Sequence, residues 1–267
     1  MKTTNKKLVI ISDFDDTLAN KYVFNEKDNS HKPIINKRLV TLIEKFERLG
    51  VPFIIATSRG FNDPNLNIIS KLSNFPIIVE SGGGLYSKGK FKNLVSKPKH
   101  IELDRVRKII KPLNPVLKKF ILNEGYDLIV RLNRFSSIEF RIQDKQGVGL
   151  ISQDIKLYKK LESKIKSILG NKIGSLQFKR GGSSLNIVPI GVSKTLGIKR
   201  LFSEMKLDKK ICFIVGIGDS EQDREIFRFS DLSICVGESK IKGSDKHIPG
   251  GSKSVVKFVR EILKKYE

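Results

Sequence analysis

The sequence has few of the residues that build disulfide frameworks, zinc sites or membrane spans. Only two cysteines occur, Cys212 and Cys235, and both lie in apolar stretches, so we expect buried thiols. The three histidines lack the spacing of zinc ligands. No apolar run reaches the roughly 18 residues of a membrane-spanning helix, and the run at residues 8–11 is too short for a signal peptide. We therefore expect a cytoplasmic protein with no membrane partner.

Acidic residues are scarce relative to basic ones. The 267 residues include 51 Lys and Arg but 28 Asp and Glu, which gives a formal net charge of +23. This charge suits an anionic partner such as nucleic acid or a phosphorylated substrate, although a lysine-rich composition would also produce it. Hydrophobic residues make up 39% of the chain, and its length allows one large domain or two small ones.

Several of the acidic residues gather near the N-terminus. Residues 8–11 are four aliphatic residues, typical of a strand buried on both faces of a parallel sheet, and Asp13, Asp15 and Asp16 follow them. Carboxylates this close repel one another, so a bound cation or a transferring phosphoryl group explains the cluster best. Ligands bind beyond the carboxyl ends of such strands. The alternative is an acidic turn that caps the next element.

Strand and helix patterns alternate at both ends of the chain. We expect strands at residues 51–56, 76–80, 184–189, 211–216 and 232–236, and helices at 36–49, 65–72, 193–205, 224–229 and 252–266. This alternation predicts an α/β fold with a doubly wound parallel sheet and right-handed crossovers.

The middle of the chain has a different pattern. Glycines at 82–84 indicate a hinge or domain boundary, and Gly181 and Gly182 a return hinge. Between them we expect a helix at 101–122 interrupted by Pro112 and Pro115, strands at 126–131, 137–142 and 175–179, and a basic helix at 151–169. We predict a core of residues 1–83 and 184–267 and a smaller domain of residues 84–183. This inserted segment holds 23 Lys and Arg against 8 Asp and Glu.

Polar clusters follow three of the predicted strands and open one helix. They are Asp13, Asp15 and Thr17; Thr57 and Ser58; Asp219 and Asp223; and Lys194. In a doubly wound sheet they converge on one edge. Carboxylates for Mg²⁺, a nucleophile, a hydroxyl and an ammonium supply the chemistry of phosphoryl transfer. Taken singly, Lys194 fits a solvated lysine, Thr57 a turn hydroxyl, and the later aspartates helix N-terminal acids.

In these motifs the sequence resembles phosphatases of the haloacid dehalogenase superfamily. The match comprises DFDDT at 13–17, ATSR at 56–59, GVSK at 191–194 and GDSEQD at 218–223, in register across both halves of the chain. The inserted segment resembles the α/β cap of the branch that includes Cof-type, sucrose-phosphate, trehalose-phosphate and mannosyl-3-phosphoglycerate phosphatases. The resemblance implies a Rossmann-like core with the cap inserted after the third strand.

The resemblance also implies a role for each motif residue. Asp13 would be the nucleophile that forms an aspartyl phosphate, and Asp15 would protonate the leaving oxygen and then activate water. Thr57, Ser58 and Lys194 would bind the phosphoryl group.

The implied cofactor is Mg²⁺. Asp13, Asp219 and the backbone carbonyl of Asp15 would ligate it, with Asp223 ligating or orienting from nearby. Two positions depart from the family pattern. Asp16 stands where many relatives have glycine, and Gln222 stands where Cof-type relatives usually have asparagine.

The implied function is a Mg²⁺-dependent phosphatase. Its partner would be a small phosphorylated substrate, such as a sugar phosphate or a phosphorylated acid like mannosyl-3-phosphoglycerate. Arg131, Arg141, Lys179 and Arg180 are candidates for substrate specificity, because an arginine fork suits a carboxylate or a second phosphate. For any one of them, a solubilising role is the alternative.

Two other functions stay open. One is a phosphomutase of the phosphomannomutase type, in which the aspartyl phosphate passes to a second hydroxyl. The other is a basic nucleic-acid-binding protein of the same fold, which the +23 charge allows. Against it, residues 84–183 have few aromatics and no stacking motif of the ribonucleoprotein kind. The sequence leaves the oligomeric state open.

Overall fold

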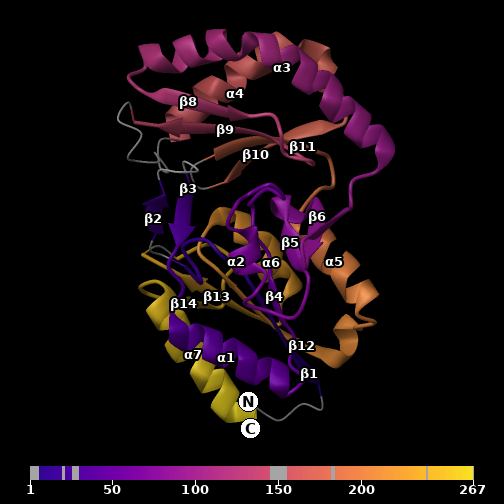
Figure 1. Cartoon of the computed structure of the whole chain (residues 1–267), viewed down its shortest axis with the longest axis vertical. Helices are drawn as coiled ribbons and strands as arrows, with labels where there is room; N and C mark the ends of the chain where they lie inside the picture. Colours follow the sequence, from indigo (N-terminus) through magenta and orange to yellow (C-terminus); the bar gives the residue numbers. More distant parts are fainter. Residues whose placement is uncertain are drawn as a thin grey trace. The chain divides into compact units, whose positions relative to one another are not determined.

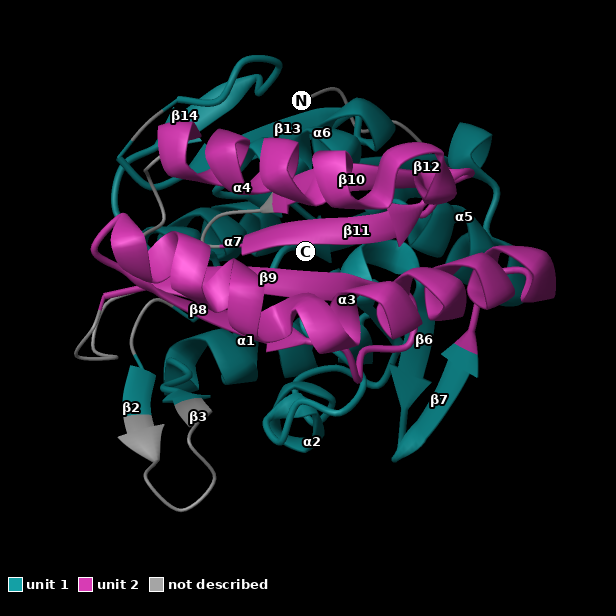
Figure 2. Ribbon diagram, turned by 90° about the horizontal axis from the view of Figure 1, so that it is seen from above, with its two compact units in different colours: residues 1–92, 193–267 teal, residues 93–192 magenta. Residues whose placement is uncertain are grey.

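Figure 1 shows a computed structural model of the chain, which describes residues 6–19, 22–25, 30–144, 155–181, 184–238 and 240–266. The chain forms two compact units. Unit 1 comprises residues 1–92 and 193–267, and unit 2 comprises residues 93–192 (Figure 2). Every helix among the described residues is too short or too polar to span a membrane.

Unit 1 is built on a parallel sheet of five strands in the order β14-β13-β12-β1-β4. The strands are β1 (Lys7–Ser12), β4 (Phe53–Ile55), β12 (Cys212–Gly218), β13 (Leu232–Val236) and β14 (Lys246–Ile248). All four pairings are parallel. The strand order reverses beside β1, since β4 lies on one side of it and β12 on the other.

Helices cover both faces of this sheet (Figure 1). α1 (Lys37–Arg48) and α7 (Ser252–Tyr266) pack together on one face, and α5 (Lys194–Glu204) and α6 (Arg224–Phe229) lie on the other. The buried residues of α1 have the spacing of one face of an amphipathic helix: Leu39, Leu42, Ile43 and Phe46. The predicted α/β fold with a doubly wound sheet is confirmed.

Short elements complete unit 1. They are the hairpin of β2 (Tyr22–Asn25) and β3 (Ser30–Pro33), α2 (Leu66–Ile69), the 3-10 turns η1 (Glu80–Gly82), η3 (Lys209–Ile211) and η4 (Glu221–Asp223), and a sheet of β5 (Ile77–Val79), β6 (Gly84–Ser87) and β7 (Lys90–Asn93). A bridge between Ala56 and Ile78 joins this sheet to the loop after β4. The sequence did not predict β2, β3, β6, β7 or β14.

The glycines at 82–84 pack closely inside unit 1 instead of forming the predicted hinge. Gly82 has a φ of +99°, and a Cβ there would lie 1.7 Å from the backbone oxygen of Ser193. A Cβ on Gly84 would lie 2.1 Å from the ring of Phe91. Because β6 pairs with β5, the boundary falls at residues 92/93.

Unit 2 is an antiparallel sheet of four strands in the order β10-β11-β9-β8. The strands are β8 (Asp127–Arg131), β9 (Ile138–Gln143), β10 (Leu176–Gly181) and β11 (Ser184–Pro189), and the 3-10 turn η2 (Gly170–Ile173) precedes β10. The prediction that residues 184–189 belong to the core is wrong, because β11 pairs with β9 and β10. The second boundary therefore falls at 192/193. Gly182, of the predicted return hinge, lies outside the described residues.

The two helices α3 (Lys97–Asn123) and α4 (Ile155–Leu169) lie over one face of this sheet (Figure 2). The predicted interruption of the first helix is wrong, since α3 continues through Pro112 and Pro115. Both prolines are exposed, so water can satisfy the carbonyls that lose their donors. Apolar residues on the opposite side of α3, among them Ile110 and Leu117, are fully buried and hold the helix to the sheet.

Candidate active site

Loops at the carboxyl ends of three neighbouring parallel strands carry the predicted catalytic residues of unit 1. Asp13 follows β1, Thr57 follows β4 and Asp219 follows β12. The backbone N–H of Asp13 donates to the carbonyl of Ile217 at 2.9 Å, which ties the first loop to β12. Lys194 is the first residue of α5. The fold thus brings these residues to one edge of the sheet, as predicted.

Three carboxylates and one ammonium form the centre of this site. Asp13, Asp219 and Asp223 each offer an oxygen within 4.8 Å of the others. Lys194 Nζ lies 2.6 Å from Asp13 Oδ1 and 2.6 Å from Asp223 Oδ1. Lys194 is 2% exposed, so the alternative of a solvated lysine is wrong.

The charges of this centre do not cancel. Burial raises the pKa of Asp13 well above its ordinary value, with Lys194 opposing the shift and Asp223 adding to it. Burial and then Asp223 raise the pKa of Asp219 to about 7. Burial lowers the pKa of Lys194, but Asp13 and Asp223 outweigh it and raise this pKa, so the ammonium stays charged. When all three carboxylates are ionised, one ammonium leaves an excess of negative charge.

The loop after β12 fixes the orientation of Asp223. Its Oδ2 accepts hydrogen bonds from the backbone N–H of Asp219 at 3.1 Å and from the N–H and Oγ of Ser220, both at 2.9 Å. Its other oxygen is thereby directed to Lys194. A Cβ on Gly218 would lie 2.3 Å from Asp223 Cβ, so this approach requires glycine. Thr17 Oγ1 donates to Asp219 Oδ1 at 2.7 Å and fixes the second acid.

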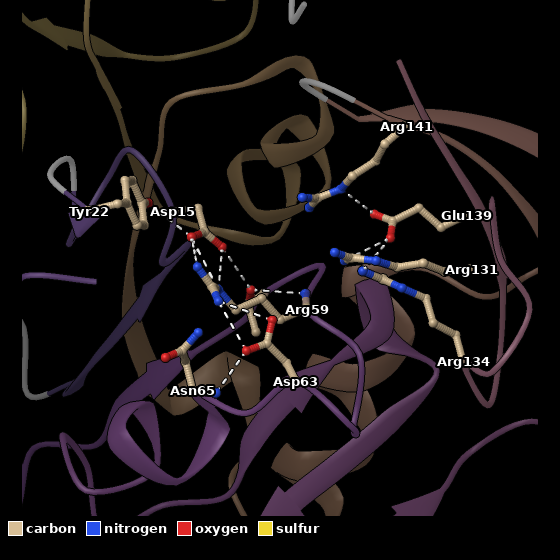
Figure 3. A network of polar contacts seen from close by, with 10 residues as sticks. Asp15, Tyr22, Arg59, Asp63, Asn65, Arg131, Arg134, Glu139 and Arg141 are labelled. Atoms are coloured by element: carbon tan, nitrogen blue, oxygen red, sulfur yellow. Dashed lines mark hydrogen bonds and ion pairs between the residues drawn. The ribbon is translucent and has the colours of Figure 1, made fainter. Parts of the chain in front are cut away.

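Asp15 lies in a separate network (Figure 3). Arg59 Nη2 lies 2.7 Å from Asp15 Oδ1, and Arg59 Nε lies 3.0 Å from Oδ2. Tyr22 Oη donates to Oδ1 at 2.9 Å, and Thr57 Oγ1 to Oδ2 at 3.5 Å. The Asp15 carboxylate is therefore occupied by side chains from two other segments and is not one of the three grouped acids.

Arg59 is a site residue for which the sequence predicted no role. Its Nη1 contacts both oxygens of Asp63 at 3.1 and 3.0 Å, and Asp63 Oδ1 also accepts the N–H of Asn65 at 2.9 Å. The guanidinium lies 5.7 Å from the centroid of the Phe14 ring. Arg59 ends the ATSR motif and precedes Asp63 by four residues. This spacing of opposite charges could have indicated the ion pair from the sequence. No comparable signal marks Tyr22.

The remaining residues of these loops have local roles. Thr57 is buried, and its Oγ1 accepts the N–H of Arg59 at 3.1 Å, as a turn hydroxyl does. Ser58 is half-buried beside it. Asp16 has a φ of +58°, in the left-handed region that glycine and aspartate tolerate best, so aspartate can stand at a position where glycine was expected from the resemblance.

The structure brings together two of the four specificity candidates in unit 2. Arg131 and Arg141 both contact Glu139, at 3.2 and 3.1 Å. Lys179 lies in the same cross-strand row as Glu139. Arg180 is on the opposite face, 5.3 Å from the ring centroid of Tyr158, a buried residue of α4.

Comparisons with known proteins agree with this fold. The sequence model of the haloacid dehalogenase-like hydrolases matches residues 10–243. Curated protein sequences give no match.

Solved structures of similar fold have low sequence identity to the chain. The C-terminal domain of trehalose-6-phosphate phosphatase from C. albicans is 14% identical, with 97% of this chain and 92% of that chain covered and a TM-score of 0.66. A haloacid dehalogenase-like hydrolase from Bacteroides thetaiotaomicron is 15% identical, with 96% and 100% covered and a TM-score of 0.61. A Thermoplasma acidophilum protein is 17% identical, with 97% and 98% covered and a TM-score of 0.60. With the family model matching most of its length, the chain belongs to the haloacid dehalogenase-like hydrolases.

Proposed function

We propose that the chain is a Mg²⁺-dependent phosphatase that hydrolyses a small phosphorylated metabolite through an aspartyl phosphate. The observation that carries this proposal is the contact of Lys194 with Asp13, set among Asp219 and Asp223 at the end of a buried strand. The ammonium can hold phosphoryl oxygens beside the nucleophilic carboxylate. The fold shared with a trehalose-6-phosphate phosphatase supports a sugar phosphate as the substrate class. A phosphorylated acid is the other class expected from the sequence.

The three grouped acids fit a divalent cation. Oxygen ligands suit Mg²⁺. The pKa of Asp13 and of Asp219 is raised first by burial and then by the neighbouring carboxylates, and a bound cation would favour the ionised form of both. When bound, the cation would offset the repulsion between these carboxylates and the phosphate dianion.

The side chains of unit 1 then divide the chemistry. A carboxylate oxygen of Asp13 attacks phosphorus, and the bond from phosphorus to the leaving oxygen breaks. Asp15 gives the leaving oxygen its proton, and later takes a proton from the water that cleaves the aspartyl phosphate. Arg59 and Tyr22 fix the direction of the Asp15 carboxylate throughout. Thr57, Ser58 and Lys194 bind the phosphoryl oxygens.

A panel of phosphorylated sugars, glycerates and nucleotides tests the proposal, with phosphate release measured with Mg²⁺ and after chelation. We expect Mg²⁺-dependent release from at least one class of ester. Full activity after exhaustive chelation would contradict the metal site. Transfer of the phosphoryl group to a second hydroxyl without release would instead identify a phosphomutase.

A further inference from the structure

Unit 2 contains a cluster of charged side chains around a buried carboxylate (Figure 3). Glu139, in β9, is 2% exposed. Arg134 Nη2 lies 2.9 Å and Arg131 Nη1 3.2 Å from Glu139 Oε2, and Arg141 Nε lies 3.1 Å from Oε1. Burial would raise the pKa of Glu139, but Arg134, Arg141 and Arg131 outweigh it and hold this pKa below its ordinary value. Glu139 is therefore an ionised anchor for three guanidinium groups.

The charges within this arginine cluster do not cancel. Three guanidinium groups surround one carboxylate, which leaves an excess of two positive charges. Arg134 is 6% exposed, whereas the side chains of Arg131 and Arg141 are 38% and 25% exposed. Two arginines are thus both accessible and held in place by Glu139. Their planar forks match the geometry of a carboxylate or a phosphate.

The sheet register extends the cluster into a polar row across all four strands. Arg131 pairs with Glu139, Glu139 with Asn186, and Asn186 with Lys179. Residues directly opposite one another on antiparallel strands share a face. Ile138 and the other neighbours of Glu139 point the other way, into the core with α3 and α4. The row therefore lies on the face away from the helices of unit 2, and it offers cations from two different strands.

We propose that the arginine cluster and this row together form a binding site for an oxyanion, a carboxylate or phosphate group of a small metabolite. Arg131 and Arg141 meet the anion, while Glu139 and Arg134 hold them in position. The anion has two possible sources. One is a second acidic group on the substrate, a case that rests on the proposed phosphatase function. The other is a separate metabolite that binds unit 2 alone.

A binding experiment tests the site without turnover. The full-length Asp13→Asn chain is titrated with malonate, in the absence of metal, by calorimetry. We expect Arg131→Gln or Arg141→Gln to weaken malonate binding by at least about tenfold, because each removes a charge-assisted contact. Arg105→Gln is the matched control, since it removes the same charge from an exposed position on α3. Circular dichroism checks that each variant is folded.

A kinetic experiment distinguishes the two sources. 3-Phosphoglycerate and glycerol 3-phosphate are compared as substrates, because they differ by a carboxylate in place of a hydroxymethyl group. If the anion belongs to the substrate, kcat/KM favours 3-phosphoglycerate, and both arginine replacements abolish the preference. If the anion is separate, malonate changes hydrolysis of both esters equally, and only in chains that retain both arginines.

Two results would overturn the site when they occur together. The first is that malonate does not bind, or that neither arginine replacement changes its binding. The second is that no kinetic effect depends on these arginines. Failure of the phosphatase function looks different. A chain that hydrolyses no ester but binds malonate through Arg131 and Arg141 refutes the phosphatase and keeps the oxyanion site.

Discussion

The charged clusters of the two units have opposite compositions. In unit 1, Lys194 lies among three aspartates that come from loops at the ends of parallel strands. In unit 2, Glu139 lies among three arginines, two of them on the antiparallel strands themselves. In each cluster, one buried charged side chain contacts side chains of the opposite charge, and these outnumber it. The excess of carboxylates in unit 1 suits a bound cation, and the excess of guanidinium groups in unit 2 suits a bound anion. Replacing one charged side chain at a time tests this comparison.

The largest expected effect comes from Asp13→Asn, which keeps the shape of the side chain but removes the proposed nucleophile. We expect kcat to fall by on the order of 10⁴-fold or more. Phosphate release from the best substrate of the panel measures it, with circular dichroism as the check on folding. A folded variant with near wild-type turnover would exclude Asp13 as the nucleophile.

Replacing the one ammonium of the aspartate cluster should have the next largest effect. Lys194→Met leaves three carboxylates without the ammonium beside them and removes a proposed phosphoryl contact, so kcat/KM should fall about 10³-fold. Lys199→Met, at an exposed position of the same helix, is the matched control and should leave kcat/KM unchanged. Equal losses in both variants would show that the effect comes from α5 and not from the site.

The two clusters should respond to pH with opposite signs. The Asp219 pKa of about 7 lies above its ordinary value of 3.8, so in metal-free protein its contribution to stability is present below about pH 4. That contribution, on the order of 4 kcal/mol, is lost as the pH rises through 7. The pKa of Glu139 lies below its ordinary value of 4.5. Its contribution to stability is therefore present above pH 4.5 and is lost as the pH falls through the lowered pKa.

Urea denaturation across this pH range, with a chelator or with Mg²⁺, measures both trends. Added Mg²⁺ should remove the loss of stability toward neutral pH, because it offsets the charge on Asp219. Metal-free protein whose stability rises steadily from pH 4 to pH 7 would contradict the origin assigned to this pKa.

Removing the anchor of the arginine cluster should destabilise unit 2. Glu139→Gln leaves three guanidinium groups around a neutral amide, which should cost about 3 kcal/mol in the free energy of unfolding. Glu162→Gln is the control, because its ion pair with Lys166 on the surface of α4 should contribute about 0.5 kcal/mol or less. Indistinguishable denaturation midpoints for the two variants would mean that Glu139 does not hold the cluster.

The smallest expected effect is that of Asp16→Gly, which removes a fourth carboxylate near the aspartate cluster. Glycine adopts the φ of +58° without strain, so activity should stay within about threefold of the wild type. Asp16→Ala should instead lower stability by about 1 kcal/mol, since alanine is strained in this region. Thermal denaturation of both variants separates the backbone effect from the charge.

The loops of the candidate active site were predictable because their signal is local. An aliphatic run that ends in aspartates marks both the buried strand and its functional end, and four motifs in register place Asp13, Lys194 and Asp219 on one edge. Helices α1, α5 and α7 were predictable for the same reason, because the spacing of apolar residues along each one is local.

The features that were not predicted from the sequence depend on pairing between distant segments. The apolar pattern of residues 184–189 fits either sheet, and only the register assigns β11 to unit 2. Glu139 reads as one polar residue between apolar ones until the strands bring arginines to it. The prolines of α3 predicted a break, but packing of Ile110 and Leu117 keeps the helix continuous.

Under the proposed mechanism, the contact of Tyr22 with Asp15 links catalysis to the local stability of the β2–β3 hairpin. Tyr22 Oη donates to Asp15 and lies 2.7 Å from the carbonyl of Ala19, so the first residue of the hairpin is attached to the loop that carries the acid. Opening of the hairpin removes one of the side chains that orient Asp15. The free energy of this opening, which hydrogen exchange reports, therefore sets the fraction of molecules in which the acid is fully oriented.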